Sequence, residues 1–313
     1  MLSILAVITP IYLLIGLGYA MTRWGLFKKE EMRVLGKFVL NVALPALIIR
    51  SLTQTALTQV FHPSYLAVYF LGTSLVIALG YLWSRGLAGQ DKLESTFNVI
   101  GMSCANSGFI GYPLLLLVMP PMAGQILALN MLGENLLIIP FLIFMAERDR
   151  ASHLGWSMVG QAFKRLLTNP VVLGIGGGLI CAVSGVVLPS ALAKTIDLMA
   201  LASSALSLFV IGGSLVGISL RHQASHIAPT VLGKLIIHPL LVFAAAALIQ
   251  SVGFPALEPD YKKAALIMAA TPMMGVYPTL AQAYGREGSS ALNMLVATVL
   301  SFPSLSLLLW ILL

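Results

Sequence analysis

Long apolar stretches alternate with short polar connections along the whole chain. A window of about 20 residues, the length that crosses the hydrocarbon core of a bilayer, separates these stretches into ten spans. Their approximate bounds are 2–22, 34–53, 64–84, 96–119, 122–146, 170–189, 196–219, 227–252, 262–284 and 288–312. Runs such as 170–189 do not alternate apolar with polar residues, which excludes a β-barrel. The pattern predicts an all-α polytopic membrane protein with ten transmembrane helices.

The composition also indicates a membrane protein. Hydrophobic residues make up 58% and charged residues only 9%, whereas soluble domains carry about 25% charged residues. The first span has no basic stretch before it and no small-residue cleavage site after it, so we expect a mature helix rather than a signal peptide. Cys104 and Cys181 both fall within spans, which disfavours a disulfide framework.

The basic residues predict the orientation in the membrane. Connections after odd-numbered spans contain twelve of them: Arg23, Lys28, Lys29, Arg33, Arg85, Lys92, Arg148, Arg150, Lys164, Arg165, Arg221 and Arg286. Connections after even-numbered spans contain four: Arg50, Lys194, Lys262 and Lys263. Because cytoplasmic loops collect Lys and Arg, we expect both termini outside. The net charge of +7 is then mostly a topogenic signal, and we predict no nucleic-acid partner.

The sequence contains an internal duplication. The segment Ala-Leu-Asn-Met-Leu occurs at 128–132 and again at 291–295, an offset of 163 residues. A Tyr-Pro pair recurs at an offset of 165, and a second proline-containing landmark at an offset of 160. Self-similarity at a nearly fixed offset indicates a repeated architecture. We predict a first five-helix repeat over 1–150, a cytoplasmic linker over 151–165 and a second repeat over 166–313.

Five spans per repeat is an odd number, so the second repeat must enter the membrane from the opposite side. Inverted repeats are typical of secondary transporters, whose substrate site lies near the bilayer midplane between discontinuous helices. The alternative is a gene duplication without transport. The pattern favours a transporter.

Spans 4 and 9 contain residues that a continuous helix avoids. Proline removes a helical hydrogen bond and glycine permits non-helical backbone angles, so both spans are predicted to break at mid-membrane. Matching breaks in the two halves favour a binding site over a pair of packed proline kinks. Because the N-terminus of a half-helix presents unpaired N–H groups and a positive dipole end, an organic anion is the predicted substrate class.

Two motifs carry a specific resemblance. Asn41–Leu47 in span 2 and Asn106–Pro113 in span 4 resemble the auxin efflux carrier family, which includes plant PIN carriers and bacterial malate or malonate permeases. The resemblance implies a fold like that of bile-acid transporters and sodium/proton antiporters, in which spans 1, 2, 6 and 7 form a scaffold and the other six form a moving, elevator-type transport domain. The long cytoplasmic loop of many plant members is absent here, as in the bacterial members.

The breaks and the resemblance together nominate the substrate-binding residues. These are Asn106, Ser107, Gly108, Gly111, Tyr112, Pro113, Thr271, Pro272, Gly275, Tyr277, Pro278, Asn41 and Pro45. Asn106 is the side chain expected to bind a carboxylate, with Ser107 beside it. Span 9 has Thr271-Pro272 where many relatives carry an asparagine nearby. For Asn41 and Pro45, helix packing is an equally good interpretation.

Five further polar residues stand in predicted hydrocarbon, where polar groups usually have a function. Asn130 and Glu134 are four residues apart and share a helix face, as do Lys234 and His238, and Asn293 repeats Asn130. Glu134 carries a coupling proton or cation in one interpretation. In the other, which we favour slightly, it is a structural partner of an intramembrane cation, for which Lys234 and His238 are candidates.

The sequence therefore predicts a secondary active or potential-driven carrier of small organic anions, such as malonate or malate, in the bacterial inner (plasma) membrane. We expect no enzyme activity, no cofactor and no metal site. We expect coupling to protons or sodium ions, and assembly as a homodimer. The alternatives are a sodium-coupled symporter of the bile-acid type, which should need acidic ligands near the crossing, a channel, and a membrane-embedded enzyme, for which Ser107 near Asn106 supplies only half of the required machinery.

Overall fold

The computed structural model describes residues 2–54, 62–150, 167–186, 188–218, 227–253 and 255–313. Every named element in these ranges is a helix, and their extended pairing is limited to one antiparallel bridge between Ala105 and Met273. Each of the predicted apolar spans coincides with helical segments. The prediction of an all-α protein is confirmed. The predicted linker 151–165 lies outside the described residues.

The first half of the chain forms helices that are interrupted by short π-helical segments, labelled η. They are α1 (Leu2–Arg23), α2 (Lys29–Phe38), η1 (Val39–Ala43), α3 (Leu44–Gln54), α5 (Pro63–Leu82), η2 (Trp83–Leu87), α6 (Lys92–Ser103), η3 (Ser107–Gly111), α7 (Tyr112–Val118), α8 (Pro120–Gly133), η4 (Glu134–Ile138) and α9 (Ile139–Arg150).

The second half of the chain also forms helices with a π-helical interruption. It forms α11 (Pro170–Ser184), α12 (Ser190–Ser214), α13 (Ile227–Leu232), η6 (Gly233–Ile237), α14 (His238–Ser251), α15 (Pro259–Ala270), α16 (Tyr277–Gln282) and α17 (Glu287–Leu312). Local sequence explains several helix ends. Asn169 caps α11 by accepting a hydrogen bond from Val171 N at 2.9 Å, and Asp91 caps α6 by accepting one from Glu94 N at 2.8 Å.

Six helices of the described residues are long and apolar enough to cross a membrane. They are Lys29–Thr53, Pro63–Leu87, Pro120–Asp149, Ser190–Ser214, Ile227–Ser251 and Glu287–Leu312. Ser107–Val118 and Pro170–Ser184 are apolar but shorter. The protein is therefore a polytopic membrane protein, and its ten crossings and inverted arrangement stay predictions.

The described helices group into two compact units. Unit 1 contains Met1–His62, Ser107–Leu136 and Phe163–Val216, and unit 2 contains Pro63–Asn106, Leu137–Ala162 and Gly217–Leu313. Each unit takes segments from both halves of the sequence, so the division into repeats at 1–150 and 166–313 stays a prediction. The units also divide spans 4 and 5 internally, whereas the resemblance implied that both spans belong wholly to a transport domain.

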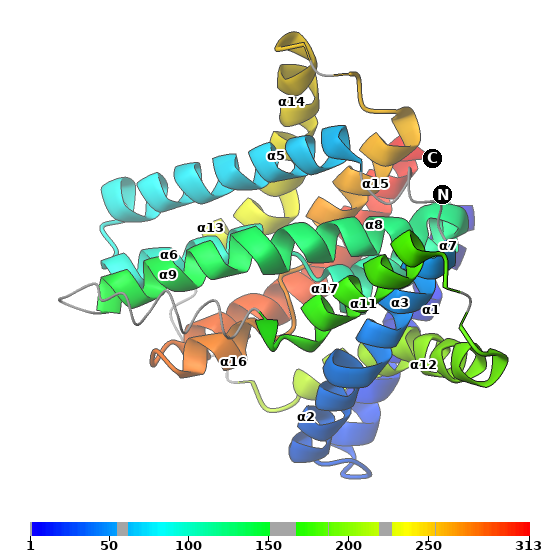
Figure 1. Ribbon diagram of the computed structural model, residues 1–313. Helices are drawn as coiled ribbons and strands as arrows, with labels where there is room; N and C mark the ends of the chain where they lie inside the picture. Colours follow the sequence, from blue (N-terminus) through cyan, green and yellow to red (C-terminus); the bar gives the residue numbers. More distant parts are fainter. Residues whose placement is uncertain (1, 55–61, 151–166, 187, 219–226, 254) are drawn as a thin grey trace. The chain divides into compact units, whose positions relative to one another are not determined.

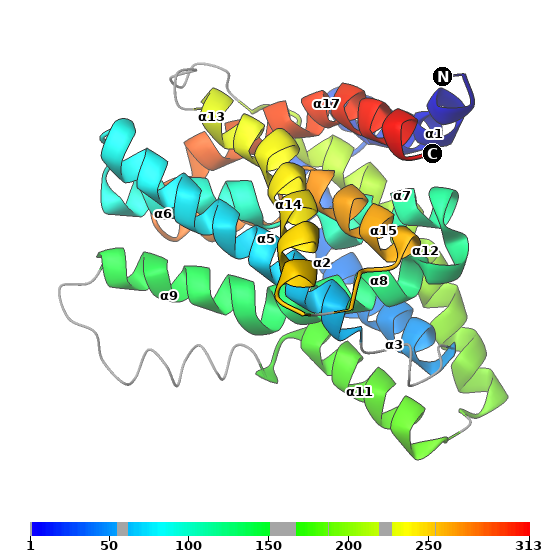
Figure 2. The same ribbon diagram turned by 90° about the horizontal axis from the view of Figure 1, so that it is seen from above.

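Unit 1 is held together by close helix contacts at glycine. A Cβ atom added to Gly212 of α12 would overlap the carbonyl oxygen of Ile15 in α1, and one added to Gly18 would overlap that of Phe209. On α11, a Cβ at Gly174 would lie 2.8 Å from Pro45 Cα of α3. Figures 1 and 2 show α11 running beside α3. Small residues let membrane helices approach to backbone distance, which accounts for these pairs.

Unit 2 also has a close helix contact at a glycine, between α5 and α14. A Cβ atom added to Gly72 would lie 2.6 Å from Val242 Cα, and Figures 1 and 2 show the two helices crossing. Gly80 and Gly233 both approach the side chain of Met102 on α6. Helix α6 is thereby enclosed by α5 and η6, and all of its residues from Ser95 to Ser103 are buried.

Candidate functional site

Two helices of unit 2 end at the positions where the sequence predicts breaks. Helix α6 ends at Ser103, and Cys104 is extended with φ −83° and ψ 115°. Helix α15 ends at Ala270, and Thr271 is extended with φ −62° and ψ 152°. The chain stays non-helical through Asn106 in the first break and through Val276 in the second. The predicted interruptions are confirmed, and their depth in the membrane stays a prediction.

The two unwound segments cross and pair through their backbones. Asn106 N donates to the carbonyl oxygen of Pro272 at 2.9 Å, and Met274 N donates to that of Cys104 at 3.1 Å. Ala105 and Met273 form the antiparallel bridge between them. Non-helical backbone inside a membrane must find its hydrogen bonds within the protein. Each break therefore supplies the partners that the other one needs.

The side chains at the crossing are deeply buried. Asn106 is 3% exposed, and Thr271 and Met273 are 0% exposed. Thr271 Oγ1 donates to Met268 O at 2.8 Å, which satisfies a carbonyl at the end of α15. A Cβ atom added to Gly275 would meet only Asn106 Nδ2 within 4 Å, at 4.0 Å, among the described atoms. The Asn106 amide therefore lies beside a position without a side chain.

The prolines and glycines after the first break do not unwind the helix. Gly108 and Gly111 lie in π-helix η3 and Pro113 in the first turn of α7, where proline is tolerated. The conformational freedom of Gly108 and Gly111, which the sequence suggested as a cause of the break, is therefore not used to unwind the chain. Proline cannot donate to the carbonyl four residues earlier, which is that of Phe109, and the Ser207 hydroxyl donates to this oxygen instead at 3.2 Å.

The matching Tyr-Pro pair in unit 2 has a structural contact of its own. Tyr277 is 1% exposed, and its hydroxyl donates to Phe97 O of α6 at 2.9 Å. Pro278 lies in the first turn of α16. Tyr277 thus ties the helix after the second break to the helix before the first. Its counterpart Tyr112 is also buried, within unit 1.

A buried polar cluster in unit 1 joins Ser107 to the following span. Ser107 Oγ donates to Glu134 Oε1 at 3.0 Å, and Asn130 Nδ2 lies 3.5 Å from the same hydroxyl. All three residues are at most 3% exposed. The predicted shared face of Asn130 and Glu134 is confirmed. A Cβ atom added to Gly108 would lie 3.0 Å from Leu44 Cδ1, so a side chain at this position would require Leu44 to shift.

A second buried network in unit 2 reaches the end of α15. Lys234 Nζ donates to His238 Nδ1 at 2.8 Å and to Ala269 O at 2.9 Å. Lys234 has only donors, so His238 accepts at Nδ1 and carries its proton on Nε2, which lies 3.1 Å from Thr73 Oγ1. Because helix C-termini carry partial negative charge, Lys234 stabilises the broken end of α15.

The two span 2 residues differ in their surroundings. Asn41 is exposed and its Nδ2 donates to Lys37 O of its own helix at 2.7 Å. Pro45 contacts Gly174 of α11. Contact with Gly174 supports helix packing as the role of Pro45, and substrate contact by either residue stays a prediction.

Polar residues named from the sequence coincide with π-helical turns. Asn41 lies in η1, Ser107 in η3, Glu134 in η4 and Lys234 in η6. Such π-bulges are frequent at functional sites. A π-turn has no sequence signature, so sequence reasoning missed this regularity.

Similarity to known proteins extends over almost the whole chain. The model of a family described as "Membrane transport protein" matches residues 3–311. A "Putative malonate transporter" of Rhizobium meliloti (strain 1021) is 26% identical over 314 residues, covering 99% of this chain and 96% of the relative. "Uncharacterized transporter YfdV" of Escherichia coli (strain K12) is 26% identical over 249 residues, 74% of each chain.

These similarities agree with the motifs read from the sequence. The chain belongs to the membrane transport protein family, that of the auxin efflux carriers. An "Uncharacterized transporter" of Methanothermobacter thermautotrophicus is 31% identical over a shorter stretch of 107 residues, 34% of this chain and 35% of the relative.

Proposed function

We propose that this protein is a secondary carrier of small organic anions, with malonate or malate as substrate, in the inner membrane of a bacterium. The observation that supports it most is the pair of crossed, unwound segments in unit 2 within a chain of the membrane transport protein family. The name of the relative from Rhizobium meliloti supports a dicarboxylate. The class of the protein is a transporter, and no enzyme chemistry is proposed.

The crossing offers donors to a carboxylate. The Asn106 amide has two N–H groups and lies beside the Gly275 backbone, where an added Cβ atom would meet no other described atom within 4 Å. The helical segment Ser107–Val118 begins directly after Asn106, and the first N–H groups of a helix lack intrahelical partners and carry positive dipole charge. Ser107, Thr271 and the two Tyr-Pro pairs stay proposed site residues.

Membrane energetics constrain the direction and the coupling. Moving one charge across 100 mV involves about 2.3 kcal/mol, so a dianion faces about 4.6 kcal/mol against entry into a cell with a negative interior. Export can use the potential alone, whereas uptake against the potential needs compensating charge, from co-transported cations or from an exchanged anion. The driving force is therefore a defining measurement for this carrier.

The mechanism that we propose is alternating access by an elevator-type movement. It includes ten membrane crossings as two inverted repeats, both termini outside and a homodimer. Reaction of terminal tags with an impermeant reagent in intact cells tests the orientation. Labelling only after the membrane is permeabilised would contradict it.

Uptake of labelled malonate and malate into proteoliposomes tests the function. The membrane potential, the proton gradient and the sodium gradient are imposed one at a time. Asn106→Ala should abolish saturable flux while the protein stays folded and abundant. Gln250→Ala, which removes an exposed amide from α14, is the matched control and should retain the flux.

A further inference from the structure

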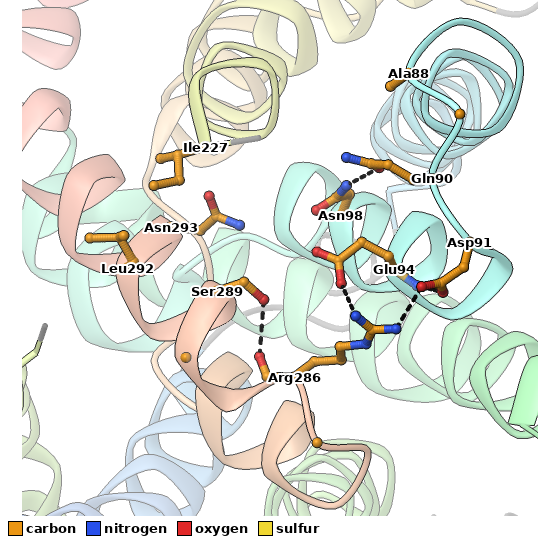
Figure 3. A pocket seen from close by; sticks show the side chains of 13 residues that line it. Ala88, Gln90, Asp91, Glu94, Asn98, Ile227, Arg286, Ser289, Leu292 and Asn293 are labelled. Atoms are coloured by element: carbon orange, nitrogen blue, oxygen red, sulfur yellow. Dashed lines mark hydrogen bonds and ion pairs between the residues drawn. The ribbon is translucent and has the colours of Figure 1, made fainter. Parts of the chain in front are cut away.

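Glu134 differs from the acidic residues at the helix ends in its surroundings. At the start of α6, Asp91 and Glu94 both pair with Arg286 at 2.7 Å, beside a polar cavity of about 710 Å³ in unit 2 (Figure 3). Glu134 instead lies near the middle of the apolar helix Pro120–Asp149, in π-helix η4, and is 3% exposed. Ionisable groups at such positions in membrane helices usually have a function.

The hydrogen bond between Glu134 and Ser107 depends on the protonation of the carboxyl group. Ser107 Oγ lies 3.0 Å from Glu134 Oε1 and 3.5 Å from Asn130 Nδ2, and all three residues belong to unit 1. An ionised carboxylate can only accept, and a serine hydroxyl has a single hydrogen. While Glu134 is ionised, the hydrogen of Ser107 is therefore directed at Glu134 and is not offered to a substrate.

Protonation reverses the direction of this hydrogen bond. A protonated Glu134 has an O–H group, which can donate to one lone pair of Ser107 Oγ while Asn130 donates to the other. The hydrogen of Ser107 is then available to a substrate carboxylate, which has acceptors only. The step adds one hydrogen to a Glu134 oxygen, changes no bond of the substrate and requires no heavy atom to move.

Protonation also removes a negative charge from the start of a helix. Ser107 begins the apolar helical segment Ser107–Val118, and the N-terminal end of a helix favours an anion. An ionised Glu134 at this end repels a bound anion. Two like charges about 5 Å apart weaken binding by at least about tenfold at an effective dielectric constant of 20. Because linkage is reciprocal, the proton and the anion favour each other's binding.

The neighbouring elements bring one charged side chain toward this part of unit 1. Helix α8, which ends at Glu134, packs against α3, η3, α7 and α11. In the described residues of these elements the charged residue is Arg50 of α3, which pairs with Asp197 at 3.0 Å. Tyr112 of α7 and Cys181 of α11 are the other titratable groups. Glu134 is thus the one carboxyl group that the described parts of these elements and of η4 contribute.

We propose that Glu134 binds the coupling proton of the carrier and that Ser107 transmits its protonation to the substrate. The inference rests on the proposed function, because it names the coupling ion of the same site. A dianion that moves with one proton carries one net negative charge instead of two, which halves the electrical work of uptake against the membrane potential.

Titration of Glu134 is measured without substrate. Infrared difference spectra of the full-length protein in detergent are recorded between pH 5 and pH 8. The wild type should show the carbonyl stretch of a protonated carboxyl group at the lower pH, with a component that is absent from Glu134→Gln. Glu30→Gln, which removes an exposed acid of α2, should keep this component. Identical carboxyl bands in the wild type and Glu134→Gln would overturn the proposal, whatever the substrate.

Coupling is measured by the binding of malonate at the same two pH values. The wild type and Glu134→Gln meet the same ionisation of malonate, so the ratio of their Kd values isolates the effect of Glu134. The glutamine amide can donate to Ser107 as a protonated glutamate does. The ratio of wild-type Kd to variant Kd should rise at least about tenfold from pH 5 to pH 8, whereas the ratio for Glu30→Gln should stay constant. A ratio for Glu134→Gln that is constant or falls would overturn the proposal.

Two further variants separate the proposal from its alternatives. Ser107→Ala should reduce the effect of pH on malonate binding, because only the charge of Glu134 then acts, and an undiminished effect would overturn the part assigned to Ser107. If Glu134→Gln melts far below the wild type and Lys234→Met restores its melting temperature, Glu134 is a structural ion-pair partner and the proposal is overturned. A protein in which Glu134 titrates but malonate neither binds nor moves would contradict the proposed function and keep the proton site.

Discussion

Replacing Thr73 by valine should destabilise unit 2 through His238. The two side chains are 0% exposed, and their polar atoms lie 3.1 Å apart. Because Lys234 donates to His238 Nδ1, the ring carries its hydrogen on Nε2, and Thr73 Oγ1 accepts it. Valine has nearly the shape of threonine but no hydroxyl, so Thr73→Val leaves a buried N–H group without a partner.

The expected magnitude follows from the burial of this pair. An unsatisfied buried donor costs about 1–3 kcal/mol. Thr73→Ser keeps the hydroxyl and loses one methyl group, which is worth about 0.8 kcal/mol. In a domain of 150–250 residues, 1 kcal/mol corresponds to about 2–4 °C in melting temperature. Thr73→Val should therefore melt several degrees below the wild type, and Thr73→Ser should lie between them.

The assay is the apparent melting temperature in detergent at one scan rate, with protein concentration held constant. A double-mutant comparison with His238→Leu isolates the pair, because the valine substitution should add little once the ring is gone. Equal melting of Thr73→Val and the wild type would refute the assigned hydrogen bond. Full additivity with His238→Leu would refute it as well.

Two further predictions concern packing and charge. Gly212→Ala should prevent the close approach of α12 to α1, because its Cβ atom would overlap Ile15 O. The expression level and the melting temperature should both fall. Gly176→Ala is the control, because its Cβ atom would meet nothing within 4 Å, and it should leave both quantities unchanged. The pKa of Asp91 lies below its ordinary value of 3.8: burial alone would raise it, but the Glu94 N–H and Arg286 outweigh burial. The ionised Asp91 side chain therefore stabilises the fold above pH 3.8, and this stabilisation is lost as the pH falls through the lower pKa of the folded state. The melting temperature of Asp91→Asn should consequently fall less than that of the wild type between pH 5 and 3.

The helices and the two breaks could be predicted because their signals are local. Apolar runs of the right length mark the helices, and Gly and Pro near Asn106 and Thr271 mark the interruptions. The partner of each break could not be predicted from either one alone. The hydrogen bonds of Asn106 N with Pro272 O and of Met274 N with Cys104 O depend on a crossing between segments about 165 residues apart, which only the fold creates.

The positions of the polar groups show the same limit. Asn130 and Glu134 share a face by helix periodicity, but their common partner Ser107 comes from another span. Arg286 could be counted as a topogenic cation, whereas its pairing with Asp91 and Glu94 depends on the turn at Gly285. The Asp91-x-x-Glu94 spacing before an apolar run is a capping signal that the sequence does carry.

Flux of labelled malonate into proteoliposomes tests the central claim most directly. The wild type, Asn106→Ala and Gln250→Ala are compared at equal protein content, with each gradient imposed separately. The account predicts saturable flux in the wild type and Gln250→Ala and none in Asn106→Ala. Unchanged flux in Asn106→Ala would remove this amide from the substrate site, and the absence of flux for every carboxylate in the wild type would contradict an organic-anion carrier.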